Sequence, residues 1–370
     1  MIHKYIIQVF DSPHWPSLRN VIETIVFSIT DPSPIVTVLI SFALYALLPL
    51  GMLYVLWLEK ANYLLTGALF LLGTLAIIQA EPLQLYAFTG MIELQGALVF
   101  IFVAYFLAKY FQSKPFPENK ELGWKVFLST TLLYHSKYPY GYMLVLSLIL
   151  LLLILNPYDS FQTFIHFIKV RSKTWKRNPR LYLILFCILA LSLPSEYLKG
   201  KLPTYFKYLI LVLISLDLFL YFKETAYTFS NSRVFFILKW VVFPILLWML
   251  SQPDRFGSYA GQITHVESQG SNPGQAVKKD LDYLLLFVTE FLLNGFQSFT
   301  LSYLIFFSNL FISIKGYYDY LKKRKITVSF IFSILCIITF LELSFFTTTR
   351  LARHTYHPFP VMMLSLLLGI

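Results

Sequence analysis

A group of side chains able to bind an anion lies near the C-terminus, in the stretch TTTRLARHTYHPFP at residues 347–360. Arg350, Arg353, His354 and His357 stand within it, between two apolar runs. Arginine binds phosphate oxygens in pairs through its planar fork, and histidine adds a donor that titrates near neutral pH. This stretch, here named the late link, therefore predicts an anion site at a membrane interface. An ordinary charged loop is the alternative.

A second cation, Lys137, stands between two apolar segments in LLYHSKYPYGY, residues 132–142. Four tyrosines surround it, namely Tyr134, Tyr138, Tyr140 and Tyr142. An ammonium group among tyrosines suits a lipid phosphate at head-group depth, with the rings forming part of an aromatic belt. The alternative is a lysine that merely extends its amine to the membrane surface.

Two carboxylates flank the stretch EPLQLYAFTG, which reads as an external loop between apolar segments. Glu81 begins it and Glu93 follows it, at the start of the next apolar run. A carboxylate in a partly apolar setting can act as a general base. An acidic residue near a helix N-terminus is also favoured by the helix dipole alone. Both interpretations stay open for Glu93, whereas the second is favoured for Glu81.

The elements that must position these residues are membrane helices. The 370 residues are 57% hydrophobic and only 13% charged, and apolar runs recur from Ile35 to the C-terminus. The sequence predicts an all-α polytopic membrane protein with about ten transmembrane or membrane-embedded helices. The predicted segments are Ile35–Leu58, Tyr63–Ala80, Met91–Phe111, Trp124–Tyr134, Tyr140–Leu155, Leu181–Leu193, Tyr205–Phe222, Val234–Leu250, a stretch within Gly295–Ile314, and Ile326–Phe346.

The chain divides into a short first part and a long second part. Residues 1–34 form an external segment whose RNVIETIVFSI pattern predicts an interfacial amphipathic helix, with Val21 and Ile25 on one face and Arg19 and Glu23 on the other. Residues 35–370 form the transmembrane domain, which includes a polar external loop at 251–280.

The net charge of +11 reflects the positive-inside rule rather than nucleic-acid binding. More than half of the 30 lysines and arginines fall in loops on the side that carries KVRSKTWKRNPR. If that side is cytoplasmic, the late link, Lys137, Glu81 and Glu93 all face outward. The chain contains no phosphate-binding loop, dinucleotide fingerprint or zinc-type spacing. An activated group would therefore come from a membrane-soluble donor, with no metal site or cofactor indicated and a divalent cation left open.

Three stretches together resemble the GT-C superfamily of polytopic glycosyltransferases. Residues 64–112 are similar to its third and fourth helices. In that superfamily an external loop after the third helix leads to an acidic residue at the start of the fourth. Residues 124–155 look like its short helix, Lys-Tyr turn and following helix. Residues 349–370 resemble its arginine-containing link and proline-started helix. The nearest relatives would be bacterial members akin to dolichyl-phosphate-mannose protein mannosyltransferases and aminoarabinose transferases.

The resemblance implies roles for particular residues. Glu93 matches the acidic position, Lys137 matches the lysine near the carrier phosphate, and Arg350 matches the arginine of the link. Asp11 is the nearest counterpart of the first-loop carboxylate, although its match is poor because the family's first span is missing. We expect Arg353 and His354 to assist phosphate binding. We also expect the natural chain to extend further at one or both ends.

The leading hypothesis is therefore a glycosyltransferase of the cell inner or plasma membrane. It would move a sugar from a polyprenyl-phosphate donor to a lipid, glycan or protein acceptor on the outer face, with inversion. Glu93 or Asp11 would be the base. Two alternatives remain, a non-catalytic transporter or flippase of lipid-linked glycans and an O-antigen polymerase or ligase.

Overall fold

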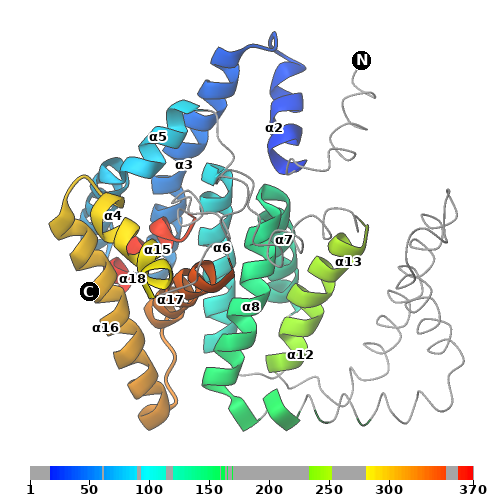
Figure 1. The fold of residues 1–370 in the computed structure, drawn as a ribbon, viewed down its shortest axis with the longest axis vertical. Helices are drawn as coiled ribbons and strands as arrows, with labels where there is room; N and C mark the ends of the chain where they lie inside the picture. Colours follow the sequence, from blue (N-terminus) through cyan, green and yellow to red (C-terminus); the bar gives the residue numbers. More distant parts are fainter. Residues whose placement is uncertain are drawn as a thin grey trace, which may run out of the picture.

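The computed structural model describes residues 17–60, 62–89, 93–113, 120–158, 160–162, 165, 169, 233–251, 281–346 and 357–369. The described part is all-helical (Figure 1). Its elements are α2 Ser17–Phe27, α3 Pro34–Glu59, α4 Tyr63–Gln79, α5 Glu81–Thr89, α6 Glu93–Gln112, α7 Lys120–Ser136, α8 Tyr138–Leu155, α12 Arg233–Ile237, the π-helical segment η2 Leu238–Val242, α13 Phe243–Ser251, α15 Leu281–Asn294, α16 Phe299–Lys323, α17 Val328–Phe346 and α18 Phe359–Gly369.

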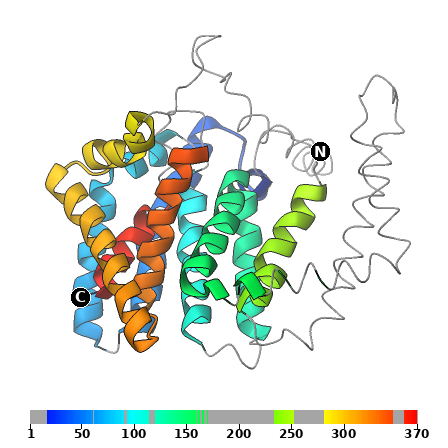
Figure 2. The ribbon, with the colours of Figure 1, turned by 60° about the horizontal axis from the view of Figure 1, so that its bottom comes forward.

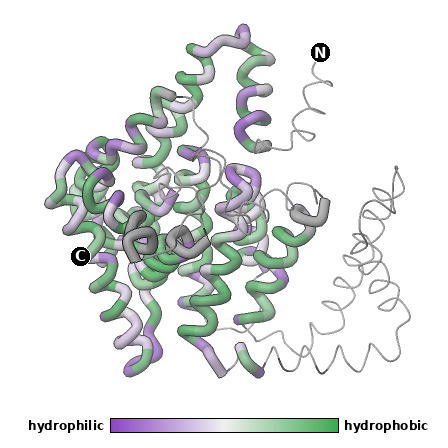
Figure 3. The backbone as a smooth tube through the Cα atoms, viewed as in Figure 1, coloured by the Kyte–Doolittle hydropathy of each residue, from purple (hydrophilic) through white to green (hydrophobic). Residues whose placement is uncertain are grey.

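Four described helices, α3, α6, α8 and α16, are long and apolar enough to cross a membrane. The pair α4 and α5 makes a fifth span if its 69° bend is counted as a break within one segment. Hydrophobic residues make up much of these helices, as the green parts of the tube in Figure 3 show, and many of the large apolar side chains are exposed. These features confirm a multi-pass membrane protein whose described part is all-helical. The predicted segments Leu181–Leu193 and Tyr205–Phe222 lie outside the described residues.

Several predicted boundaries were wrong. Residues 81–89, predicted as a loop, form α5. The short segment predicted to begin at Trp124 begins earlier, at Lys120. Its first turn is helical but polar, so a prediction from hydrophobic runs does not include it. α15 lies in a stretch for which no helix was predicted. The late link ends in α18 as expected, with His357 its first described residue.

The N-terminal amphipathic helix forms as predicted, but its polar side faces protein. α2 packs against α7, and Arg19 is buried, donating to Glu23 Oε1 at 2.7 Å and to the Thr37 carbonyl at 2.8 Å. Ile25 and Ile29 point away from the bundle and are exposed. An arrangement with apolar residues outward and a bonded arginine inward is typical of a helix in contact with lipid.

Helix ends gather at two opposite faces of the bundle (Figure 2). At one end Lys109 of α6 pairs with Glu59 of α3 at 2.6 Å, and Lys60 Nζ donates to the Leu368 carbonyl at 3.4 Å. The basic residues 322–325 follow at the same end, because Tyr320 donates to the last carbonyl of α8, that of Leu155, at 2.6 Å. We call this the basic end, and its composition agrees with the predicted grouping of basic loops.

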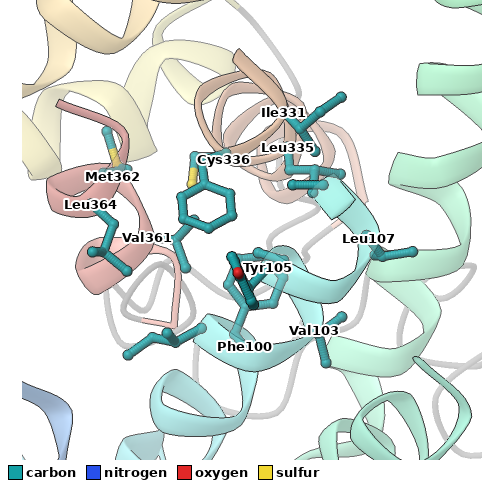
Figure 4. Close-up of a cluster of buried hydrophobic side chains, with 14 of the residues drawn as sticks. Phe100, Val103, Tyr105, Leu107, Ile331, Leu335, Cys336, Val361, Met362 and Leu364 are labelled. Atoms are coloured by element: carbon teal, nitrogen blue, oxygen red, sulfur yellow. The ribbon is translucent and has the colours of Figure 1, made fainter. Parts of the chain in front are cut away.

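The core is built around α6, the most buried of the four candidate spans. Side chains of α6, α17 and α18 meet there, as Figure 4 shows for Phe100, Cys336 and Val361. Between helices of similar apolarity, close packing and buried hydrogen bonds supply the stabilisation. One such bond runs from Asn309 of α16 to the Met362 carbonyl of α18 at 3.1 Å.

The Tyr140 ring of α8 lies against the backbone of α6 at Gly96, where only glycine leaves room for it. A Cβ added to Gly96 would overlap Cε2 of Tyr140, whereas one added to Gly67 of α4 meets no atom within 4 Å. We expect Gly96→Ala to lower the free energy of unfolding by about 1–3 kcal/mol through overpacking. Gly67→Ala, the matched control, should cause no loss. Thermal unfolding in detergent micelles measures both, and equal effects would contradict the packing described here.

Candidate active site

A buried ion pair lies at the end of the bundle opposite the basic end. Lys137 Nζ donates to Glu93 Oε1 at 2.9 Å, and both side chains are at most 10% exposed. Glu93 is the first residue of α6, and Lys137 is the single residue between α7 and α8. The structure thus brings together the two residues that the sequence singled out separately. The second carboxylate oxygen, Oε2, is buried without a hydrogen bond to any described residue.

The local sequence fixes the turn that carries Lys137. Lys137 is extended, with φ −163°, and its carbonyl accepts from the Tyr140 amide at 2.9 Å. Pro139 follows in the first turn of α8, where its missing N–H has no helical partner to lose. Gln95 Nε2 donates to the Ser136 carbonyl at 3.1 Å, which ties the start of α6 to the end of α7. Backbone contacts on both sides of Lys137 therefore fix the turn from which its side chain extends.

The last part of the late link lies next to this pair. The His357 ring packs on the Tyr140 ring with centroids 3.9 Å apart, and it contacts the Phe100 ring edge-on at 5.0 Å. His357 is buried, and Lys137 Nζ lies 5.2 Å from the centroid of Tyr140. Glu93, Lys137, Tyr140 and His357, here named the outer cluster, thus come from three separate parts of the chain.

The tyrosines do not form the predicted aromatic belt. Tyr134, Tyr138 and Tyr140 are fully buried within the protein. Their rings pack against one another and against the histidines instead, as with Tyr134 and Tyr138 at 5.0 Å. The prediction was wrong because tyrosines placed on both sides of a lysine in the sequence do not indicate whether neighbouring helices cover their rings.

The electrostatic character of the outer cluster follows from three helix starts. α6 begins at Glu93, α8 begins after Lys137, and α18 begins two residues after His357. Each N-terminus carries a partial positive charge and orphan N–H groups, which favour an anion. Glu93 supplies the anion in this structure. A phosphate group could take its place beside Lys137.

The other candidate residues are not part of the cluster as described. Glu81 is exposed at the start of α5, consistent with a simple N-terminal acidic residue. Asp11, Arg350, Arg353 and His354 lie outside the described residues. Within the ranges that are described, no three His, Cys, Asp or Glu side chains gather as metal ligands would.

Sequence reasoning missed two features of this region. The packing of the Tyr140 ring on the His357 ring depends on tertiary contact and could not be predicted. The position of His357 just before the proline-started helix α18 was a usable signal that this histidine lies at a helix start. The lone acidic residue of α17, Glu342, was overlooked inside an apolar run. It is buried and accepts from Ser147 of α8 at 2.9 Å.

Fold and cluster define a multi-pass membrane protein, all-helical in its described part, with a buried ion pair at one end. Comparison with protein-family models, curated protein sequences and solved structures gives no match for this chain.

Removing one partner of the buried pair leaves the other charge without compensation. We expect Lys137→Met or Glu93→Gln alone to lower the free energy of unfolding, by about 3–5 kcal/mol for a fully uncompensated charge. The double variant should recover most of that loss because no charge remains. Denaturant unfolding of the four proteins in micelles gives the coupling energy. Additive single effects would show that the two groups do not interact.

Proposed function

We propose that this protein is a membrane glycosyltransferase that takes a sugar from a polyprenyl-phosphate donor. The observation that carries the proposal is the buried contact between Glu93 and Lys137. The resemblance assigns one of them to the base and the other to the carrier phosphate, and the reaction requires these groups at the same sugar. The two residues are 44 positions apart in the chain, so the sequence alone does not require their contact, and the contact supports a shared role.

The proposed step starts with an exchange of partners. The donor phosphate enters beside Lys137, and the ammonium group turns from Glu93 to the phosphate oxygens. Glu93, no longer paired with the amine, is then free to accept a proton. The start of α8 adds its amide dipoles to the phosphate, which favours the charge that develops on the leaving group.

Glu93 then removes the proton from the acceptor hydroxyl as that oxygen attacks the anomeric carbon. The bond between this carbon and the phosphate oxygen breaks, and the polyprenyl phosphate leaves with the electron pair. A single displacement inverts the anomeric configuration. Arg350, Arg353 and His354, from the late link that also contains His357, would hold the same phosphate. Asp11 remains a second candidate for the base.

The position of the outer cluster supports an outward-facing reaction. It lies at the end opposite Lys60, Lys109 and the basic residues 322–325, which the positive-inside rule places toward the cytoplasm. The reaction would therefore take place on the extracytoplasmic side of the inner or plasma membrane. The acceptor there would be a lipid, a glycan or a protein.

A second function is a flippase or transporter of lipid-linked glycans. The observation that favours it is that Lys137 already neutralises Glu93, so the pair can exchange an internal anion for a phosphate without any base. In that case Lys137 remains essential, whereas the basicity of Glu93 does not matter.

The distinguishing experiment follows sugar transfer from labelled polyprenyl-phosphate sugars to a membrane extract, with purified protein in vesicles. General-base catalysis contributes about 10²–10⁴-fold, so Glu93→Gln should reduce transfer by at least the lower figure while donor binding stays measurable. Glu81→Gln, an exposed glutamate near the same end, is the control and should transfer normally. Full activity in Glu93→Gln would exclude it as the base. Donor movement across the vesicle without transfer would favour the flippase.

A further inference from the structure

The lone carboxyl of α17 lies deep between helices. Glu342 is 2% exposed, and its Oε1 accepts a hydrogen bond from Ser147 Oγ at 2.9 Å. Its Oε2 is buried and has no hydrogen-bond partner among the described residues. The group is thus served by one neutral donor, whereas the buried Glu93 faces an ammonium group.

Charges on the helices packed against α17 are engaged elsewhere. These helices are α6, α8, α15, α16 and α18. Their described charged side chains are Glu93 and Lys109 of α6, Glu290 of α15, and Lys315, Asp319, Lys322 and Lys323 of α16, with Lys137 preceding α8. Lys109 bonds Glu59, Glu290 accepts from Asn294, and the α16 charges lie toward the basic end. Within the described part of the chain, Glu342 forms no ion pair.

A buried site with one neutral hydrogen-bond donor strongly favours the neutral carboxylic acid over the ionised carboxylate. An ionised carboxylate inside a membrane protein requires a cation or several donors to replace its hydration. A neutral carboxylic acid requires far less: its carbonyl oxygen accepts from one hydroxyl donor, and leaving its uncharged O–H group without a partner costs much less than burying an ionised carboxylate. The surroundings of Glu342 suit the neutral acid.

We propose that Glu342 is a proton-binding residue, which in its neutral form accepts a hydrogen bond from Ser147 and so holds α17 against α8. Ser147 lies two helical turns from Tyr140 on the same face of α8. The late link follows α17 and returns to Tyr140 through His357. The bond therefore holds α17 against α8, the helix whose start carries Lys137 and Tyr140 of the outer cluster, whatever reaction that cluster carries out.

Infrared spectroscopy of the purified protein in lipid vesicles near neutral pH tests the proton directly. A protonated carboxyl absorbs above the amide bands, and its band shifts in D₂O. We expect such a band in the wild type, its loss in Glu342→Gln and its retention in Glu93→Gln, the control glutamate that faces a cation. In Ser147→Ala the band should move to higher frequency because the carbonyl loses its donor. A wild type without the band, or a band that Glu342→Gln leaves unchanged, would overturn the proposal.

Thermal unfolding of the same proteins tests the positioning role. Glutamine keeps an oxygen that accepts from Ser147, so Glu342→Gln should melt within a few degrees of the wild type. Glu342→Leu removes the acceptor and should melt clearly lower. If glutamine destabilises as much as leucine, the carboxyl is ionised or the hydrogen bond is unimportant, and the proposal fails. Neither measurement uses a glycosyl donor, so failure of the transfer assay leaves this inference intact.

Discussion

The contact between Glu93 and Lys137 is the interaction on which the outer end of the bundle depends. It joins the first residue of α6 to the residue that separates α7 from α8, and both side chains are buried. In a membrane, a lone charge at this position would be costly, so each group makes the other tolerable. The same dependence makes the pair sensitive to any anion that competes with Glu93 for the amine.

The protein handles its two buried glutamates in different ways. Glu93 lies at a helix start, where the dipole and Lys137 both favour its charge. Glu342 lies within α17 beside a hydroxyl group and no described cation. The first arrangement keeps a charge beside its counter-ion, whereas in the second the carboxyl forms a hydrogen bond between two helices. The first contact lies at the residue just before α8 and the second within α8, so this helix links the outer cluster to the interior.

Charge in an apolar sequence was the signal that led to the right residues. Glu93 and Lys137 could be identified because each interrupts or borders a hydrophobic run, but their contact could not be predicted, since it depends on how α6 packs against α7 and α8. The need for glycine at position 96, where the Tyr140 ring packs, could not be predicted from the sequence either. Hydropathy also concealed polar helical turns, so α7 was predicted too short. A lone glutamate in a long apolar run was too small a signal to reveal Glu342.

The most direct test of the central claim is a structure of the protein in lipid with a polyprenyl phosphate bound. The account predicts that the phosphate lies within about 3 Å of Lys137 Nζ, as expected for a charge-assisted hydrogen bond, and that Glu93 Oε1 has moved out of contact with the amine. A phosphate bound elsewhere, with the contact between Glu93 and Lys137 intact, would contradict it.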